Sequence, residues 1–205
     1  MKRITLEKAA SAELVEKKSV FIGYASPVTS EEEAIEFIKT IKKKHADARH
    51  NVYAYMLNGG GIARYSDDGE PQGTAGVPVL DIIRKGGFCD AVIVVTRYFG
   101  GILLGAGGLV RAYSAAARMA VEAAGIVTYD LFTEFSLTVS YNDHGKLTTL
   151  LAQANPLRDG IDYAEGVTLR LALPRDELED FRAKASEITA GRAVFEVTGE
   201  RFDKR

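Results

Sequence analysis

One segment, from Val92 to Ala117, restricts what this 205-residue chain can fold into more than any other. Residues 91–98 are apolar at nearly every position and rich in β-branched side chains, which predicts a strand buried on both faces. A glycine-rich loop follows, and the alanine-rich part from about 109 to 124 predicts a helix. Because alanine side chains are small, such a helix can pack closely on the sheet.

The loop in this segment has the composition of an anion-binding site. Its five glycines are Gly100, Gly101, Gly105, Gly107 and Gly108. Glycine lets the backbone approach a ligand, and the free N–H groups at a helix start favour negative charge. Arg97 precedes the loop and Arg111 follows it, so we predict a phosphate- or nucleic-acid-binding site here. The alternative is that the glycines serve only tight turns and helix–sheet packing.

Two common nucleotide motifs are excluded by their spacing. A P-loop requires Lys-Ser/Thr after its last glycine, whereas Gly108 is followed by Leu-Val-Arg. The dinucleotide fingerprint requires a third glycine at the position that Val110 occupies. A less specific anion site remains, which could receive a nucleotide phosphate, an RNA phosphate or a carboxylate of a partner protein.

A second polar segment, 66–76, is poor in apolar residues and rich in turn formers, so we expect an exposed loop. Its candidate partner- or ligand-binding residues are Asp67, Asp68, Glu70, Gln72 and Thr74. Such side chains can bind a metal, a ribose or a basic partner. The acids do not have the spacing of an EF-hand calcium loop, and no metal site is predicted from them.

No catalytic residue is predicted. Ser114 lacks the flanking glycines of a hydrolase nucleophile elbow, and the histidines are scattered. His50, at a strand end, and Arg64 are additional candidate site residues, although a structural role also accounts for His50. The single cysteine, Cys89, excludes a disulfide framework and a cysteine-rich zinc module.

The overall composition is that of an ordinary soluble globular protein, with 46% hydrophobic and 26% charged residues. The net charge of −2 gives no global field that would attract nucleic acid or a membrane, although a local basic patch can still form. No window approaches about 18 consecutive apolar residues, and the N-terminus lacks the apolar core of a signal peptide. We therefore expect a cytoplasmic protein with no membrane partner.

The pattern of residue types along the chain changes near Asp130. This change predicts two domains, 1–130 and 131–205, and an α+β fold class. In the first domain, Ser30 and Glu33 have capping-box spacing at the start of a helix, and a charged lead-in precedes the first strand. The expected elements there are a strand at 20–28, a helix at 30–45, strands at 50–57 and 62–66, a helix at 77–85, and then the segment described above.

The second domain has the element order β-α-β-β-α-β, which is typical of the split-βαβ, ferredoxin-like arrangement. Its two helices would cover one face of a four-stranded antiparallel sheet. The expected elements are strands at 131–141, 157–163, 167–173 and 193–201, and helices at 144–155 and 174–190.

Long motifs in the first domain resemble the signature of the YigZ/IMPACT family. They read SDDGEP-x-GTAG-x-P at 66–78 and VVTRYFGG-x-x-LGAGGLVRAY at 94–113, with HN-x-YAY at 50–55. The resemblance covers about 15–125, and the remainder is similar, more loosely, to the smaller C-terminal domain of bacterial members.

The resemblance implies a two-layer N-terminal α/β domain like the second domain of small-subunit ribosomal protein five. It also implies a C-terminal domain like the ferredoxin-like domains of elongation factor G. Both architectures recur in proteins that touch RNA or the ribosome. Eukaryotic relatives act in translational control by binding the activator of a starvation-responsive initiation-factor kinase.

Three functions remain open. The first is a non-enzymatic binding protein associated with RNA, the ribosome or a translation factor. Further phosphate contacts would be Lys42, Lys43, Lys44, Arg49 and Arg64, although lysines at a helix C-terminus also have a structural cause.

The second is a nucleotide- or phosphate-ligand-binding enzyme or sensor, because the same ribosomal-type fold serves small-molecule kinases of the GHMP class. Only in that case is a cofactor expected, with Asp67, Asp68 and Glu70 holding Mg²⁺ or acting as a base. The third is a protein-interaction module whose acidic loop docks a basic partner. No oligomeric state follows from the sequence.

Overall fold

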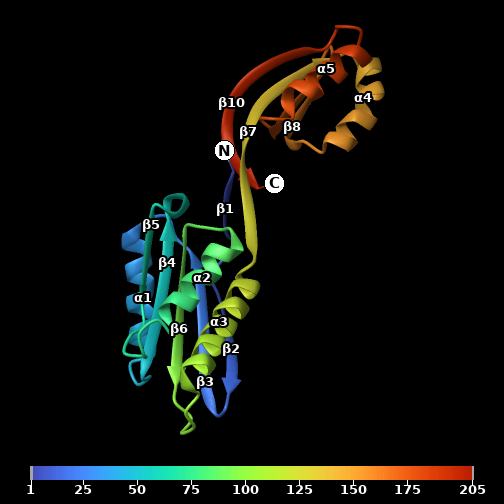
Figure 1. Cartoon of the computed structure of the whole chain (residues 1–205). Helices are drawn as coiled ribbons and strands as arrows, with labels where there is room; N and C mark the ends of the chain where they lie inside the picture. The colour runs from blue at the N-terminus through green and yellow to red at the C-terminus, as the bar shows by residue number, and fades with distance from the viewer. Residues whose placement is uncertain (1, 205) are drawn as a thin grey trace. The chain divides into compact units, whose positions relative to one another are not determined.

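The computed structural model describes residues 2–204, which form two sheets, five α-helices and one short 3₁₀ helix (Figure 1). The fold is α+β, as predicted. The chain divides into two compact units: an N-terminal unit, Arg3–Thr128, and a C-terminal unit that begins at Tyr129 and also includes Lys2.

The N-terminal unit has a sheet of five strands in the order β2-β3-β6-β4-β5, in which every pair is antiparallel. Its elements are β1 (Arg3–Leu6), β2 (Ala10–Glu16), β3 (Ser19–Pro27), α1 (Glu31–Lys44), β4 (His50–Leu57), η1 (Asn58–Gly60), β5 (Ile62–Ser66), α2 (Gly76–Gly86), β6 (Ala91–Tyr98) and α3 (Gly105–Ala124). The central strand β6 coincides with the apolar run expected at 91–98.

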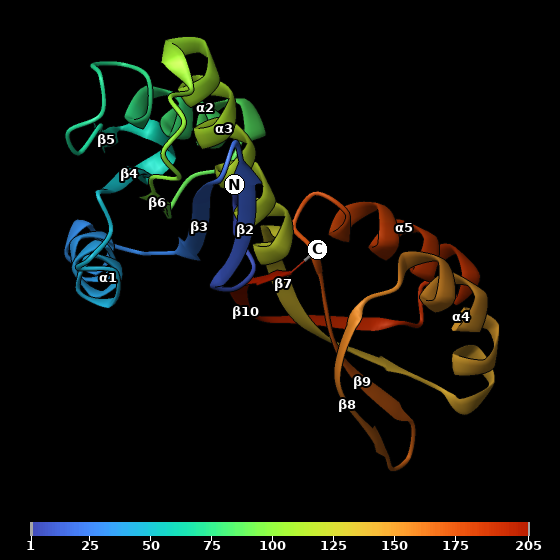
Figure 2. The same ribbon diagram turned by 90° about the horizontal axis from the view of Figure 1, so that it is seen from below.

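Helices cover both faces of this sheet, and this explains why β6 is apolar throughout. Val92 and Val94 pack in the cluster under α1, whereas Ile93 and Val95 pack in the cluster under α2 and α3. Figure 2 shows α1 and the α2–α3 pair on opposite sides of the strands. The expectation of two layers was therefore wrong, because α1 adds a third layer with its own core.

The N-terminus of α1 is capped largely as its sequence predicts. The Ser30 hydroxyl accepts a hydrogen bond from the Glu33 N–H at 3.3 Å. The Glu33 carboxylate, in turn, accepts from the N–H and the hydroxyl of Thr29, at 2.6 and 2.9 Å. The reciprocal half of the capping box thus involves Thr29 rather than Ser30.

Two strands lie in the segment expected to be only a charged lead-in, β1 and β2. Strand β2 forms the edge of the sheet and pairs with β3 through a tight turn at Lys17 and Lys18, both with positive φ. Its alternating burial places Leu14 against the core, while Ser11, Glu13 and Val15 are exposed.

The helix α3 begins four residues earlier than the sequence predicted. Gly105, Gly107 and Gly108 therefore belong to its first turn and not to a loop. The true loop is 99–104, where Gly100 is needed for a close approach, since a Cβ there would lie 2.0 Å from the carbonyl of Lys18.

The C-terminal unit has the expected element order, with the antiparallel pairs β10–β7, β7–β9 and β9–β8. The sheet has five strands and not the expected four, because β1 also pairs with β7. Its elements are β7 (Ile126–Val139), α4 (Tyr141–Ala154), β8 (Leu157–Tyr163), β9 (Val167–Pro174), α5 (Leu178–Ile188) and β10 (Val194–Lys204). One core forms on the face covered by α4 and α5, around Phe135, Leu137 and Leu171. The other face carries polar side chains, including the ion pair between Arg201 and Glu134.

Candidate functional site

The two long motifs meet inside the N-terminal unit at a single carboxylate, that of Glu70. Arg97 Nη1 at the end of β6 donates to Glu70 Oε1 at 2.6 Å, and the Tyr113 hydroxyl on α3 donates to the same oxygen at 2.8 Å. Glu70 and Arg97 are only 9% and 6% exposed, and Tyr113 is fully buried. The acidic segment and the glycine-rich segment therefore form one structure, which we call the Glu70 cluster.

His50 joins this cluster from the start of β4, where it pairs in register with Arg97. Its Nδ1 lies 2.8 Å from the backbone oxygen of Asp68, and its Nε2 lies 3.8 Å from Glu70 Oε1. The Asp68 carboxylate accepts from Lys42 Nζ and from the Asn51 N–H, both at 2.7 Å. Of the candidate residues, the structure thus brings His50, Asp68, Glu70 and Arg97 together.

The electrostatics of the cluster favour a fixed arrangement over a reactive one. Burial, reinforced by the negative charge of Glu70, raises the pKa of Tyr113, so its phenol stays protonated and donates. The Arg97 guanidinium lies over the rings of Phe21 and Phe99, 5.4 and 5.5 Å from their centroids. Within residues 2–204, Arg97 Nε is buried without a hydrogen-bond partner.

The segment 66–76 is not the exposed loop expected from its composition. Asp67 Oδ1 accepts from the N–H groups of Ala75 and Gly76, at 3.1 and 2.8 Å, and Oδ2 accepts from Gly73 N at 2.9 Å. These bonds close the loop and cap the start of α2, whose N-cap residue, Ala75, has no side chain to do so. The carboxylates turn inward because buried N–H groups and Arg97 need partners.

Two further candidates of this loop have different surroundings. The Thr74 hydroxyl is buried and donates to the Pro71 carbonyl at 2.6 Å, whereas Gln72 is exposed. Because the three acids point to different partners, no group of three metal-ligating side chains gathers anywhere in residues 2–204.

The two arginines that bracket the glycines have different environments. Arg97 is buried and paired, so in this conformation it does not face a phosphate in solvent. Arg111 is exposed on α3, and its Nη1 lies 3.8 Å from where a Cβ on Gly107 would be, beside the first turn. The helix begins without a side-chain cap, so its N–H groups there remain open.

The other basic candidates lie outside the cluster. Lys43, Lys44 and Arg49 are exposed at and after the end of α1, and Lys42 pairs with Asp68. Arg64 is exposed on the edge strand β5 and donates to the neighbouring Ala63 carbonyl at 3.1 Å.

Sequence reasoning missed the apolar residues that surround the start of α3. Phe99, Ile102 and Leu103 in the loop and Val110 in the helix are exposed, and Leu103 is 82% exposed. Three exposed basic residues lie close to these apolar ones. Arg111 is on α3, and Lys17 and Lys18 form the turn against which the loop packs at Gly100. We call this set the Leu103 surface: Phe99, Ile102, Leu103, Val110, Lys17, Lys18 and Arg111. Three large apolar residues within a glycine-rich loop are the signal that could have predicted it.

The Glu70 cluster and the Leu103 surface both lie in a segment that matches a known family. The model of the Impact N-terminal domain matches residues 17–121, and a second model, described as a domain of unknown function (DUF1949), matches residues 137–192. The IMPACT family member YvyE of Bacillus subtilis is 40% identical over 190 residues, covering 92% of this chain and 88% of that protein. The chain belongs to the IMPACT family.

Other comparisons also extend over both units. The IMPACT family member YigZ of Escherichia coli is 36% identical over 188 residues, covering 89% of this chain and 92% of that protein. A crystal structure of a hypothetical protein is similar with a TM-score of 0.61 and 32% identity, covering 96% of this chain and 97% of that chain. None of the helices within residues 2–204 has the length and apolar character needed to cross a membrane.

Proposed function

We propose that this IMPACT family chain is a non-enzymatic binding protein in translational regulation, which contacts RNA, the ribosome or a translation factor through the Leu103 surface. The observation that carries the proposal is the 82% exposure of Leu103 in the 99–104 loop, which lies between Arg97 and Tyr113, the two residues that donate to Glu70. Large apolar side chains on a soluble domain are costly to expose, and contiguous ones mark interaction sites. A cytoplasmic location is part of the same proposal.

The Glu70 cluster gives the long motifs a role in this binding. Arg97 lies directly before the loop and Tyr113 follows it on α3, and both donate to one buried carboxylate. The clamp fixes the two ends of the segment, so the loop is presented with little ordering left to occur on binding. Such preorganisation increases affinity because fewer side chains and dihedrals must be immobilised.

The chemistry of the Leu103 surface matches a partner that is both apolar and anionic. Arg111, Lys17 and Lys18 are exposed, and the uncapped first turn of α3 adds N–H donors. Single-stranded RNA is recognised by such a combination, in which cations follow the backbone and flat or apolar side chains contact unstacked bases. Family membership supports the link to translation, because the resemblance implies translational control for eukaryotic members.

The two alternative functions receive less support. A Mg²⁺–nucleotide enzyme would need Asp67, Asp68 and Glu70 as ligands, but each carboxylate already accepts hydrogen bonds within the domain. An acidic loop that docks a basic partner would need the same carboxylates on the surface. Both functions would require the Glu70 cluster to open, at the cost of unpairing buried charges.

The finer fold assignments belong to this proposal as well. We assign the N-terminal unit to the architecture of the second domain of small-subunit ribosomal protein five, with α1 as an additional layer. The C-terminal unit is assigned to the ferredoxin-like class seen in elongation factor G. The strand order β10-β7-β9-β8 with two helices on one face supports the second assignment.

Co-sedimentation of the full chain with ribosomes, together with electrophoretic shifts on structured and unstructured RNA, tests the proposal. We expect L103D to abolish binding and R111Q to lower the log–log salt slope by about 0.7 for single-stranded RNA. Ile35→Asp changes an exposed apolar residue on α1, across the sheet, and R118Q removes an exposed charge further along α3, so both serve as controls. Failure of the unmodified chain to bind ribosomes or RNA at low salt would refute the proposal.

A further inference from the structure

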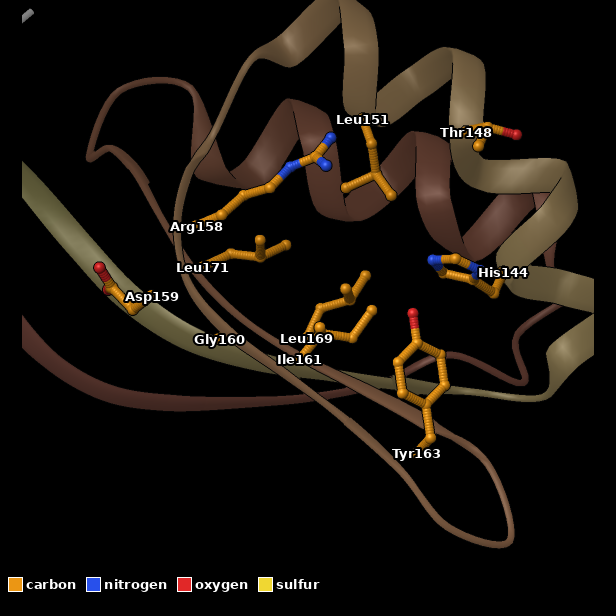
Figure 3. A pocket seen from close by; sticks show the side chains of 10 residues that line it. All are labelled: His144, Thr148, Leu151, Arg158, Asp159, Gly160, Ile161, Tyr163, Leu169 and Leu171. Atoms are coloured by element: carbon orange, nitrogen blue, oxygen red, sulfur yellow. The ribbon is translucent and has the colours of Figure 1, made fainter.

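The C-terminal unit contains a cavity of about 490 Å³ between α4 and strands β8 and β9 (Figure 3). This volume falls within the range of roughly 300–1,000 Å³ that is usual for small-molecule sites. Its floor is aliphatic, formed by Leu151, Leu169 and Leu171 with Ile161 at the edge. The cavity belongs to the C-terminal unit, whereas the Glu70 cluster and the Leu103 surface belong to the N-terminal unit, so the function proposed above does not use it.

A β-bulge points a cation into this cavity. In the β8–β9 ladder, Arg158 pairs with Leu171 and Gly160 pairs with Arg170, so Asp159 is an extra, unpaired residue. The extra residue reverses the alternation of β8 on one side of the bulge. Residues opposite each other share a face, so Arg158 lies on the same face as the buried Leu171, Leu169 and Val167. Without the bulge, Arg158 would point to the opposite face.

The Arg158 guanidinium is available for a ligand. Its acidic neighbours already have partners: Asp159, which also lines the cavity, accepts from Arg201 Nη1 and Nη2, at 2.7 and 2.9 Å, and Asp162 pairs with Arg170. The hydrogen bonds from Arg201 lower the pKa of Asp159, which keeps its charge in that pairing. In Figure 3 the side chains of Arg158 and Asp159 diverge, and Arg158 extends over the cavity toward Leu151. Among residues 2–204, Arg158 has no ion pair.

The opposite end of the cavity offers hydrogen-bonding groups. His144 begins a stripe on α4 that continues through Thr148 and Leu151, with the i, i+4, i+7 spacing of one helix face. Tyr163 approaches from β8, and Figure 3 shows its hydroxyl turned toward the His144 side of the cavity. The Tyr163 ring also stacks on Tyr141, with centroids 6.4 Å apart and planes at 13°, which supports its position.

We propose that this cavity binds a small carboxylate with an elongated apolar body, of the medium-chain type. The carboxylate pairs with Arg158, whose planar guanidinium suits bidentate recognition. The body lies over Ile161, Leu169 and Leu171, and a polar group at its far end reaches His144 and the Tyr163 hydroxyl. From the Arg158 pair to the Tyr163 pair, β9 advances four residues, about 13 Å at roughly 3.3 Å per residue. This length suits a chain of medium size.

Titration calorimetry and amide NMR of the full chain with octanoate, 8-hydroxyoctanoate and 1-octanol test the assignment. Octanoate should bind saturably and shift amides of α4, β8 and β9, 8-hydroxyoctanoate should bind more tightly, and 1-octanol more weakly. R158Q should weaken octanoate binding by about tenfold, the effect of losing hydrogen bonds to a charge. Y163F should remove the advantage of 8-hydroxyoctanoate over octanoate.

The matched control is R170Q, which removes an equal charge from the outer face of the same strand pair. It should change octanoate affinity by less than about twofold, because distant exposed charges are screened by salt. Circular dichroism verifies that each variant is folded. The absence of saturable octanoate binding, or equal effects of R158Q and R170Q, would overturn the proposal.

Discussion

The two sheets of this protein differ in whether their ion pairs are buried or exposed to solvent. The N-terminal sheet is covered by helices on both faces, and the charged pair at the end of its central strand, Arg97 with Glu70, is buried. The C-terminal sheet is covered on one face only, and its open face carries Arg201 with Glu134, Asp159 and Asp203 in partial contact with solvent. A similar set of side chains therefore fixes geometry in one unit and covers a surface in the other.

The difference is one of desolvation. When an ion pair is buried, both charges lose their hydration, and their mutual attraction must compensate for that loss. The pair therefore acts mainly by making other arrangements of the charged groups unfavourable. A solvent-facing pair keeps most of its hydration and adds little stability. It can therefore be replaced with little effect on the fold. The comparison predicts large effects in the N-terminal unit and small ones on the open C-terminal face.

The largest effect is expected for E70Q, which leaves the Arg97 charge buried without a counter-ion. Loss of one partner of a buried pair costs about 3–5 kcal/mol of unfolding free energy. Urea denaturation of E70Q and of E134Q, in the partly exposed Arg201 pair, measures the contrast. We expect E134Q to cost about 1 kcal/mol or less. Similar losses in the two variants would contradict the distinction drawn between the sheets.

A steric effect of intermediate size is expected for Gly23→Ala in β3. A Cβ at Gly23 would lie 2.4 Å from the Ala116 carbonyl oxygen of α3, so the helix would have to move off the sheet. Overpacking of this kind costs about 1–3 kcal/mol. Gly145→Ala on α4, where a Cβ would have nothing within 4 Å, is the control and should stabilise the helix. Thermal unfolding of both variants should show shifts of opposite sign.

A pH-dependent effect is expected for D143N at the start of α4. Hydrogen bonds from Arg192 above all, then from Ser140 and Lys146, lower the pKa of Asp143. The stability that the carboxylate contributes is therefore complete above the unfolded pKa of about 3.9, and is lost as the pH falls through the lower, folded pKa.

The difference in unfolding free energy between the unmodified chain and D143N should accordingly be large at pH 7 and shrink below pH 4. Denaturation at a series of pH values measures it. D162N, whose carboxylate is mostly exposed, is the control. A difference that is the same at pH 3 and pH 7 would mean that Asp143 acts through packing and not through its charge.

The smallest effect is expected for R170Q, which breaks the Arg170–Asp162 pair on the open face of the C-terminal sheet. Both side chains are more than half exposed, so the cost should be within about 0.5 kcal/mol. Urea denaturation is again the measurement. A loss above about 1 kcal/mol would show that this face is less solvated than an exposed pair requires.

The sequence predicted those elements whose own pattern determines them. The bounds of β4 follow from alternation, and those of β6 follow from a continuous apolar run. The edge strand β2 was missed because its exposed positions include the apolar Val15 as well as Ser11 and Glu13, which obscures the alternation. The early start of α3 was missed because the clustered glycines Gly105, Gly107 and Gly108 suggest a loop. Of these three, only Gly105 has a positive φ.

The candidate site was harder to predict because it depends on contacts between distant segments. The motifs indicated which segments matter, but composition suggested that Glu70 is exposed, and only the register of β4 and β6 brings it to Arg97 and His50. Arg158 is a similar case. Its inward orientation depends on one unpaired residue, Asp159, and alternation in the sequence alone assigns it to the other face.

The clamp at Glu70 has a consequence for how this family can diversify. Arg97 and Tyr113 join the two sides of the segment between them, as a cross-link would, in a chain whose one cysteine leaves no disulfide to do so. With the base of the loop closed, its exposed residues Ile102 and Leu103 are free to change without loosening the domain. Substitutions at these two residues of the loop can then change the choice of partner, while the clamp at its base maintains the stability of the domain.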